Sequence, residues 1–359
     1  MTSGETKAGA TPDPELDRVF EHLSSVDRLA RIVAGVRQAI DEVIATGRTR
    51  RWNLDQCNNQ EKAYVGVNLE NILRESLDLP PGRPLKPDFE IAGVDVDCKW
   101  SRNWGGWQIP NEALNEICLL VYGDDLEAEI AVGLIRIREQ LLVGGNRDQK
   151  RTIQRPEGLD AVRWLVPKGD GLPDNFLMNL RKEDREAILA PRGGDARAHE
   201  LFTRCEGLII HRHIIESVGQ QVDAARRARA SRVGLEAIGF ELLNGHWKAD
   251  RTRAKELGGP EPQDDTQWVC LRSDGSTPAR RAALEPQRLA QAQAYRDLMK
   301  KNLREQRKLE KQLREAEKAL LAEIEQQSEH SDAQSSLAVA DAETRAAEIS
   351  EQLLLETDV

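Results

Sequence analysis

The apolar residues of this chain change their spacing near residue 89, and this change limits the folds that the chain can adopt. Across residues 15–46 and 58–77, apolar side chains recur every three or four positions, which is typical of amphipathic helices. The stretch FEIAGVDVDCKW, which begins at Phe89 and turns at Gly93, instead predicts a tight β-hairpin. The β-rich runs 117–122 and 130–137 predict further strands. We therefore expect an α/β (α+β) domain with a mixed sheet flanked by helices.

The chain has 359 residues, more than one average domain, which predicts two folded units with extensions. The first predicted unit covers residues 13–166 and the second covers 174–276. The stretch 167–173 (PKGDGLP) is rich in proline, glycine and charge, and we predict that it links the two units.

The second predicted unit has a helical pattern over 180–189 and 199–230, followed by β-rich stretches at 233–245 and 266–274. This order is typical of a winged helix–turn–helix. In that interpretation Gly207 lies in the turn, and a helix from His211 to Arg229 enters the major groove. Paired helices with a glycine in their turn also occur in proteins that never bind DNA, so the alternative stays open.

The two ends of the chain have their own patterns. Residues 1–12 are rich in Thr, Gly, Ala and Pro and are predicted to be a disordered leader. Residues 283–326 predict a long helix, and residues 327–359 an acidic tail. Several apolar residues of the long helix fit a coiled-coil seam interrupted by Asn302 and Gln306. The seam comprises Tyr295, Met299, Leu309, Leu313, Ala316 and Leu320.

The net charge of −10 counts against a nucleic-acid partner on average, but the charge is unevenly distributed. Residues 277–320 hold twelve basic and six acidic residues, a net of +6, whereas residues 321–359 hold one basic and ten acidic residues, a net of −9. Basic clusters also lie in the body of the chain, where they could contact phosphates or simply form solvated surfaces. The candidate DNA-binding residues are Arg147, Lys150, Arg151, Arg212, Arg226, Arg227 and Arg229.

The chain has no apolar run long enough for a membrane span and no signal-peptide pattern, so we expect a cytoplasmic protein. Its cysteines are odd in number and lack a C-x-x-C pair, which argues against a disulfide framework and a structural zinc site. We expect reduced, mostly buried thiols. They are Cys57, Cys98, Cys118, Cys205 and Cys270.

The residues with the clearest chemical potential lie on the predicted hairpin. Asp88 and Asp97 are nine residues apart on consecutive strands, so their carboxylates can converge on one divalent cation. Lys99 follows Asp97 by two residues and therefore shares its face of the strand. This set suits Mg²⁺-dependent hydrolysis of a phosphodiester, with Lys99 orienting the nucleophile and offsetting charge in the transition state. An exposed Asp/Lys pair on a strand is the alternative.

Glu70, on the preceding helix, could complete the acidic cluster, and Cys98 completes the set of candidate metal ligands with Glu70, Asp88 and Asp97. Carboxylates gathered without a metal would repel one another and take up a proton, so the cluster predicts affinity for a cation.

Aromatic and histidine residues give weaker signals. Trp104 and Trp107 could stack on bases beside the site or pack their loop onto the domain, and packing is the commoner role. His211 and His213 lie two residues apart, which is poor spacing for joint metal binding on a helix. For one of them we expect a role at the surface or facing DNA.

Several segments resemble the NaeI-type (type IIE) restriction endonucleases. They are EKAYVGVNLENILRE (61–75), FEIAGVDVDCKWS (89–101), NRDQKR (146–151) and LFTRCEGLIIHRHIIESVGQQ (201–221). The resemblance covers about residues 15–275, with the chain from about 277 expected to lie outside it. It implies that Glu70, Asp88, Asp97 and Lys99 are the metal-binding and catalytic residues.

The resemblance also implies an N-terminal endonuclease domain of the PD-(D/E)xK kind and a C-terminal winged-helix, CAP-like domain similar to part of type IA topoisomerases. It further implies a homodimer that needs Mg²⁺ and binds two copies of a double-stranded DNA site, one cleaved and one acting as effector. A cognate DNA methyltransferase would be its functional partner.

We therefore expect a Mg²⁺-dependent, sequence-specific type II endonuclease that cuts both strands as a symmetric dimer. The alternative is a DNA-binding transcriptional regulator with a vestigial nuclease domain. A third hypothesis, an assembly scaffold, rests on the coiled-coil segment alone and explains none of the acidic motif.

Overall fold

The computed structural model describes residues 12–80, 88–145, 149–329 and 344, the side chains of 323–329 excepted. The chain divides into two compact units, Met1–Gln291 and Ala292–Val359. In these described residues no helix is long and apolar enough to cross a membrane. The leader and nearly all of the acidic tail lie outside the described residues, so those two predictions stay predictions.

Helices open the first unit, as the apolar period predicts. Each main helix begins at a polar cap: the Asp13, Ser25 and Asn58 side chains accept backbone N–H groups of the first turn. The helices are α1 (Pro14–Leu23), α2 (Val26–Ile44), the one-turn α3 (Thr46–Thr49), the 3₁₀ turn η1 (Leu54–Gln56) and α4 (Asn59–Ser76).

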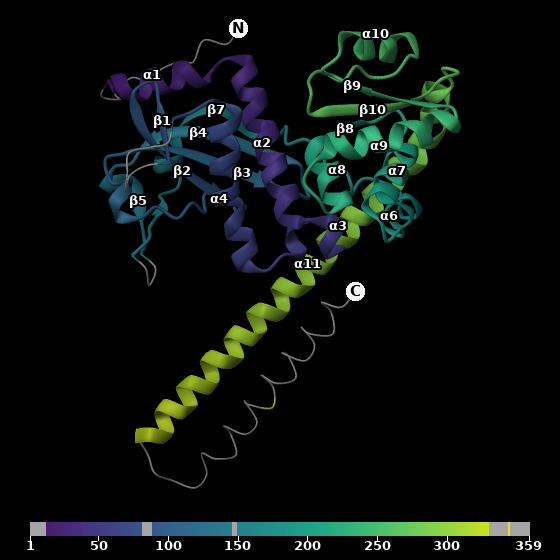
Figure 1. Cartoon of the computed structure of the whole chain (residues 1–359). Coiled ribbons are helices and arrows are strands. Elements are labelled where there is room, and N and C mark those ends of the chain that lie inside the picture. The colour runs from purple at the N-terminus through teal and green to yellow at the C-terminus, as the bar shows by residue number, and fades with distance from the viewer. Residues whose placement is uncertain (1–11, 81–87, 146–148, 330–343, 345–359) are drawn as a thin grey trace. The chain divides into compact units, whose positions relative to one another are not determined.

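A five-stranded mixed sheet follows, in the order β1-β2-β3-β4-β7 (Figure 1). Strands β2 and β3 pair in parallel, and the other neighbours pair antiparallel. Its strands are β1 (Phe89–Ile91), β2 (Val94–Ser101), β3 (Ile117–Asp124), β4 (Glu129–Arg136) and β7 (Arg163–Asp170). Small elements connect them: η2 (Asn111–Ala113), η3 (Glu139–Leu141), β5 (Leu142–Val143), β6 (Thr152–Ile153) and α5 (Glu157–Asp160).

The sheet is buried on both faces. On one face Val94, Val96 and Cys98 of β2 join the core formed with α2 and α4. On the other face Cys118 and Leu120 of β3 pack with an aromatic group that includes Trp107 and Trp164. This arrangement confirms the predicted mixed sheet flanked by helices.

The prediction of a linker at 167–173 is wrong at its N-terminal end, because residues up to Asp170 belong to β7. Strand β7 is an edge of the sheet, where a proline such as Pro167 and solvated polar side chains are tolerated. Lys168 pairs with Glu129 of β4 at 2.5 Å, so the charge that indicated a linker instead joins two strands.

The remainder of the first unit is a second, mostly helical core with a three-stranded antiparallel sheet in the order β8-β10-β9. Its elements are α6 (Lys182–Leu189), α7 (Gly194–Arg204), β8 (Ile209–His211), α8 (Arg212–Gly219), α9 (Ala224–Ala237), β9 (Phe240–Asn244), α10 (Lys248–Glu256) and β10 (Gln267–Arg272).

The single helix predicted over His211–Arg229 is wrong, and so is the helix-to-helix turn at Gly207. Gly207 has a φ of +74° and leads into strand β8, not into a helix. Gln220 and Asp223 also adopt positive φ values, 56° and 102°, and this break separates α8 from α9. Asp223 then caps α9 by accepting the Arg226 N–H.

The long predicted helix is present as α11 (Thr277–Glu329) (Figure 1). It begins six residues before the predicted start, and Pro286 lies inside it. Residues 292–329 of this helix belong to the second unit.

Candidate active site

The hairpin register brings the two predicted aspartates together. Phe89 pairs with Val96 and Ile91 with Val94, so the next position outward sets Asp88 opposite Asp97. The backbone N–H of Cys98 donates to Asp88 Oδ2 at 2.7 Å and holds that carboxylate against β2. The nine-residue spacing in the sequence thus becomes a direct juxtaposition.

Lys99 lies beside Asp97 on β2, as the alternation of side chains along a strand predicts for residues two positions apart. Its Nζ is 2.6 Å from Asp97 Oδ2, and both side chains are mostly buried. Burial opposes the charge of Lys99, but Asp97 and Asp88 outweigh it and raise the lysine pKa. Lys99 therefore stays an ammonium beside the two aspartates.

Glu70 on α4 belongs to the same electrostatic cluster. Burial and the charge of Asp88 raise the pKa of Glu70 to about 7. Burial also raises the pKa of Asp97 to about 6; Lys99 acts against the shift, and Asp88, which shares a side-chain hydrogen bond with Asp97, adds to it. The cluster thus holds more negative charge than Lys99 alone can balance.

This donor set suits a hard divalent cation, because Mg²⁺ binds carboxylate oxygens and would relieve their repulsion. No three His, Cys, Asp or Glu side chains among the described residues are arranged to hold a metal ion as they stand. Asp97 is instead engaged with Lys99 and Asp88. The chemistry of the residues fits Mg²⁺, and binding would require these carboxylates to exchange their present partners.

Two cysteines flank the cluster. The Cys98 thiol is 3% exposed and lies in the core beneath α2 and α4, on the face of β2 opposite Asp97. Burial, and after it the charges of Glu70, Asp88 and Asp97, raise the pKa of this thiol, and its role as a metal ligand stays a prediction. Sequence reasoning missed Cys118, whose Sγ is 3.8 Å from Asp97 Oδ2 across the parallel pair β2–β3.

Sequence reasoning also missed Arg74, one turn beyond Glu70 on α4. Its guanidinium donates to the Asp88 carbonyl at 3.3 Å and to Asn71 Oδ1 at 3.1 Å. It thereby ties α4 to the start of the hairpin, and its charge acts on Glu70. A basic residue four positions after a candidate acid was a signal that could have identified it.

The predicted DNA-binding residues fall into different environments. Arg226 and Arg229 are exposed on α9. The prediction for Arg227 is wrong, because its side chain is 5% exposed and its guanidinium bonds to Asp195 and Gln221. Arg212 is about half exposed and pairs with Asp265 at 3.4 Å.

The basic segment at 146–151 is only partly described. Arg147 lies outside the described residues. Lys150 is exposed, and Arg151 pairs with Glu139 at 2.5 Å. These residues are separate in sequence from the acidic hairpin, and their role in DNA binding remains a prediction.

Trp104 and Trp107 pack within the domain, which is the commoner of the two roles considered for them. Trp107 is fully buried and donates through Nε1 to the Val121 carbonyl at 2.9 Å. Trp104 contacts Trp107, Tyr122 and Trp164 with ring centroids 5.3–5.6 Å apart. The loop between β2 and β3 is thereby fixed onto the sheet.

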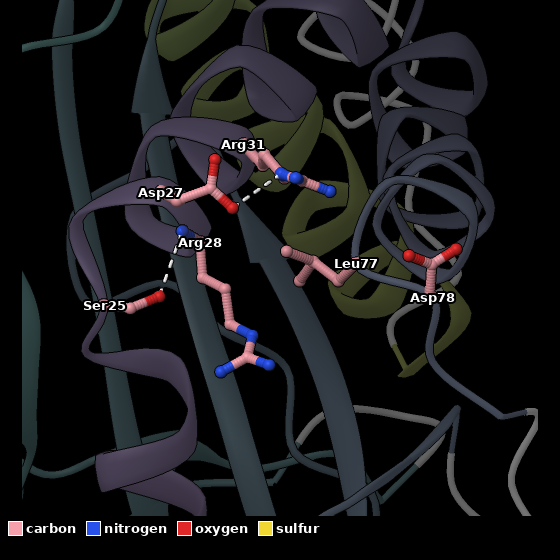
Figure 2. Close-up of a pocket in the computed structure, with 6 residues that line it drawn as sticks. All are labelled: Ser25, Asp27, Arg28, Arg31, Leu77 and Asp78. Atoms are coloured by element: carbon pink, nitrogen blue, oxygen red, sulfur yellow. Dashed lines mark hydrogen bonds and ion pairs between the residues drawn. The ribbon is translucent and has the colours of Figure 1, made fainter.

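The His213 side chain is mostly buried, at 11% exposed, and its Nε2 lies 3.0 Å from Asp41 Oδ2. A surface pocket of about 340 Å³ lies between the α1–α2 turn and the end of α4, apart from the acidic cluster (Figure 2). Its two arginines already have partners: Arg31 pairs with Asp27 at 3.0 Å, and Arg28 donates to the His22 carbonyl at 2.6 Å.

The structure brings two opposed aspartates, a lysine and a helical glutamate together on a mixed sheet, and comparison with known proteins shows the class of enzyme to which the chain belongs. A family model described as restriction endonuclease NaeI matches residues 17–323. The type II restriction enzyme NaeI of Lentzea aerocolonigenes is 36% identical over 264 residues, which cover 71% of this chain and 82% of that enzyme.

The chain belongs to the NaeI restriction endonuclease family and is an enzyme of the DNA-cleaving hydrolase class. This confirms the resemblance stated from the sequence. The match to residue 323 corrects one expectation: much of α11 lies within the family model, although we expected the chain from about 277 to lie outside it.

Proposed function

We propose that this protein is a Mg²⁺-dependent, sequence-specific type II endonuclease that hydrolyses phosphodiester bonds of double-stranded DNA. The observation that carries the proposal is the opposition of Asp88 and Asp97 on the hairpin, with Lys99 2.6 Å from Asp97. Glu70 belongs to the same cluster, since burial and then the charge of Asp88 raise its pKa.

The carboxylates and the lysine have different roles: the carboxylates bind the cation, and the lysine acts on the phosphate. Glu70, Asp88 and Asp97 would hold Mg²⁺, which when bound polarises the scissile phosphate and lowers the pKa of a bound water. The Lys99 ammonium offsets negative charge that develops on the phosphate and orients the attacking water. The backbone N–H of Cys98 and the Arg74 guanidinium hold Asp88 in position.

The elements α8, α9, β9 and β10 support a winged-helix DNA-binding domain, with α9 as the helix that faces DNA. The arginines Arg226 and Arg229 are exposed on α9 and would contact phosphates. Arg227 is excluded from this role by its burial. A second, effector copy of the DNA site would bind through this domain.

We further infer a homodimer, because a two-fold symmetric protein matches a palindromic site. A cognate methyltransferase would protect the same site in the host, and the enzyme would work in the cytoplasm. The alternative, a regulator with a vestigial nuclease domain, is not favoured, since all four acid and lysine positions are present and the family is one of endonucleases.

The first test is incubation with a large, fully sequenced, unmethylated DNA in Mg²⁺, beside an EDTA control. Discrete metal-dependent fragments are expected, and sequencing their ends gives the site. Asp97→Asn removes one charge from the cluster and should lower cleavage by at least 100-fold, a loss typical of a group that acts on the transition state.

Glu90→Gln is the matched control, because Glu90 lies on the same hairpin, opposite Asp95. It should cleave as the wild type does, and Asp97→Asn should still retard DNA in a gel. Equal cutting by Asp97→Asn and wild type would refute the assignment. Wild-type binding without cutting would favour the regulator.

A further inference from the structure

A group of arginines lies in the first unit where α3 meets the segment between α6 and α7. Arg50 caps the C-terminal end of α3 in a left-handed conformation, with a φ of 62°. Its guanidinium donates to the carbonyl of Leu189, the last residue of α6, at 2.7 Å. Arg192 follows Leu189 by three residues, and both Arg50 and Arg192 are exposed. Two exposed guanidinium groups therefore belong to adjoining segments.

Two further arginines are buried beside them. Arg197 is 6% exposed, and its guanidinium donates to carbonyl oxygens, including that of Arg192 at 2.9 Å. Arg227 of α9 is 5% exposed and bonds to Asp195 at 2.5 Å. Burial, and after it the charges of Arg50 and Arg227, lower the pKa of Arg197. The charges of these arginines therefore act on one another.

This group, which we call the arginine cluster (Arg50, Arg192, Arg197 and Arg227), carries an excess of positive charge. Among the residues that the structure describes, Asp195 is the one carboxylate that pairs with any of the four, so four positive charges and one negative charge give a net of +3. Gly193 caps α7 without a side-chain acceptor, so the N–H groups of the first turn add positive potential. Like charges gathered in this way predict affinity for an anion.

The chemistry of the cluster fits the phosphates of nucleic acid. A guanidinium offers several N–H donors in a planar fork, which matches the oxygens of a phosphate. The bond to Leu189 fixes the Arg50 side chain before any partner binds, which reduces the entropy lost on binding. The cluster also adjoins α9, where the exposed Arg226 directly precedes Arg227. Charge complementarity and this continuity with α9 favour duplex DNA as the partner.

We propose that Arg50 and Arg192 bind backbone phosphates of duplex DNA, while Arg197 and Arg227 add charge from beneath without contacting the DNA. This inference rests on the proposed function, because it requires that the protein bind DNA, and it extends the DNA-contacting surface from α9 to α3. Phosphate contacts position a duplex without reading its bases. The two arginines therefore strengthen binding to DNA of any sequence.

The salt dependence of DNA binding tests the proposal. Fluorescence anisotropy of a labelled duplex of arbitrary sequence, titrated with full-length Asp97→Asn protein at several KCl concentrations, measures binding without cleavage. Each lost phosphate contact should make the slope of log K against log salt concentration shallower by about 0.9. Arg50→Gln/Arg192→Gln should therefore flatten the slope by about 2 and weaken binding by roughly tenfold at low salt. Arg50→Lys/Arg192→Lys keeps the charges and should retain the slope.

Arg204→Gln/Arg253→Gln is the matched control. It removes the same charge from arginines that pair with carboxylates, Arg204 with Glu200 at 3.2 Å and Arg253 with Glu241 at 2.7 Å. Its slope should equal that of the Asp97→Asn parent. Equal flattening in the control and in Arg50→Gln/Arg192→Gln would show that only the net charge of the protein matters, and would overturn the proposal.

An unchanged slope and affinity in Arg50→Gln/Arg192→Gln, with thermal unfolding like that of the parent, would also overturn the proposal. Arg192→Gln alone should flatten the slope by about 1. This variant keeps the test decisive if loss of the Arg50 anchor unfolds the double variant, because the Arg192 side chain has no hydrogen bond or ion pair with the described residues. Absence of DNA binding by the parent would refute the proposed function itself, which the other outcomes leave intact.

Discussion

At the scale of single residues, the neighbours of a carboxylate determine what it can do. Glu61 and Glu70 lie on the same helix, α4. The Arg51 side chain lowers the pKa of Glu61 to about 2, whereas burial and Asp88 raise that of Glu70 to about 7. Glu61 is therefore ionised in a structural ion pair. The ionised form of Glu70 is disfavoured when no cation is bound.

Glu70→Gln should stabilise the metal-free protein while abolishing cleavage. Because the folded-state pKa of Glu70 is raised, the wild type loses stability as the pH rises from about 4.5 to about 7. With a discount for partial exposure, the variant should gain about 1–2 kcal/mol in free energy of unfolding at pH 8. The gain should shrink at pH 5, where Glu70 is protonated.

Urea unfolding in EDTA at both pH values measures this difference, with Glu75→Gln, exposed on the same helix, as the control. An equal effect of Glu70→Gln at pH 5 and pH 8 would show that the charge of Glu70 is not the cause.

At the scale of elements, caps and ion pairs attach the helices to the sheet. Asp13 accepts the Leu16 N–H at the start of α1 and also pairs with Arg136 of β4 at 2.6 Å. The Arg163 guanidinium of β7 lies 4.2 Å from the Phe20 ring of α1. The first helix is thereby held against the edge of the sheet far from the acidic cluster.

Asp13→Ala should cost about 1–2 kcal/mol in free energy of unfolding at pH 7, because the cap and the ion pair are lost together. The Arg136 side chain lowers the pKa of Asp13 to about 2. The contribution is therefore complete above about pH 4 and is lost as the pH falls toward 2. Thermal unfolding at pH 7 and pH 2.5 measures it, beside Glu21→Ala on the exposed side of α1. A variant as stable as wild type at pH 7 would contradict the argument.

At the scale of the whole first unit, a close backbone contact and a buried charge network join the sheet-containing part to the helices that follow. Arg37 bonds to Asp41 at 2.6 Å and to Asp125 at 2.7 Å, and His213 of α8 contacts Asp41. Beside this network Gly47 of α3 lies against α8, where an added Cβ would fall 1.8 Å from the Ser217 carbonyl oxygen.

Gly47→Ala should therefore destabilise the first unit by about 3 kcal/mol, since two backbones must separate to admit one methyl group. The acidic cluster itself is not touched by this change. Gly145→Ala, with open space around its Cβ, is the matched control. Chemical denaturation measures both; an unchanged midpoint for Gly47→Ala would mean that α3 and α8 do not pack closely in solution.

Much of the site could be predicted because its geometry is local. A hairpin register relates Asp88 to Asp97, and the alternation of one strand relates Asp97 to Lys99, so spacing alone brought these groups together. The contacts of Arg74 with Asp88 and of Cys118 with Asp97 could not be found in the same way, although the spacing from Glu70 indicated Arg74 as a neighbour of that acid. The two side chains reach the cluster from another helix and another strand, and only their packing sets those distances.

The sequence by itself determined the elements whose interactions are between near neighbours: the capped helices, the hairpin at Gly93 and the long helix α11. Only the tertiary structure decided which arginines of α9 face solvent, that residues 167–170 extend an edge strand, and that α8 and α9 are separate helices. It also decided the raised pKa values of Glu70 and Asp97. The physical reason is that burial and charge proximity depend on residues distant in sequence, which no local pattern encodes.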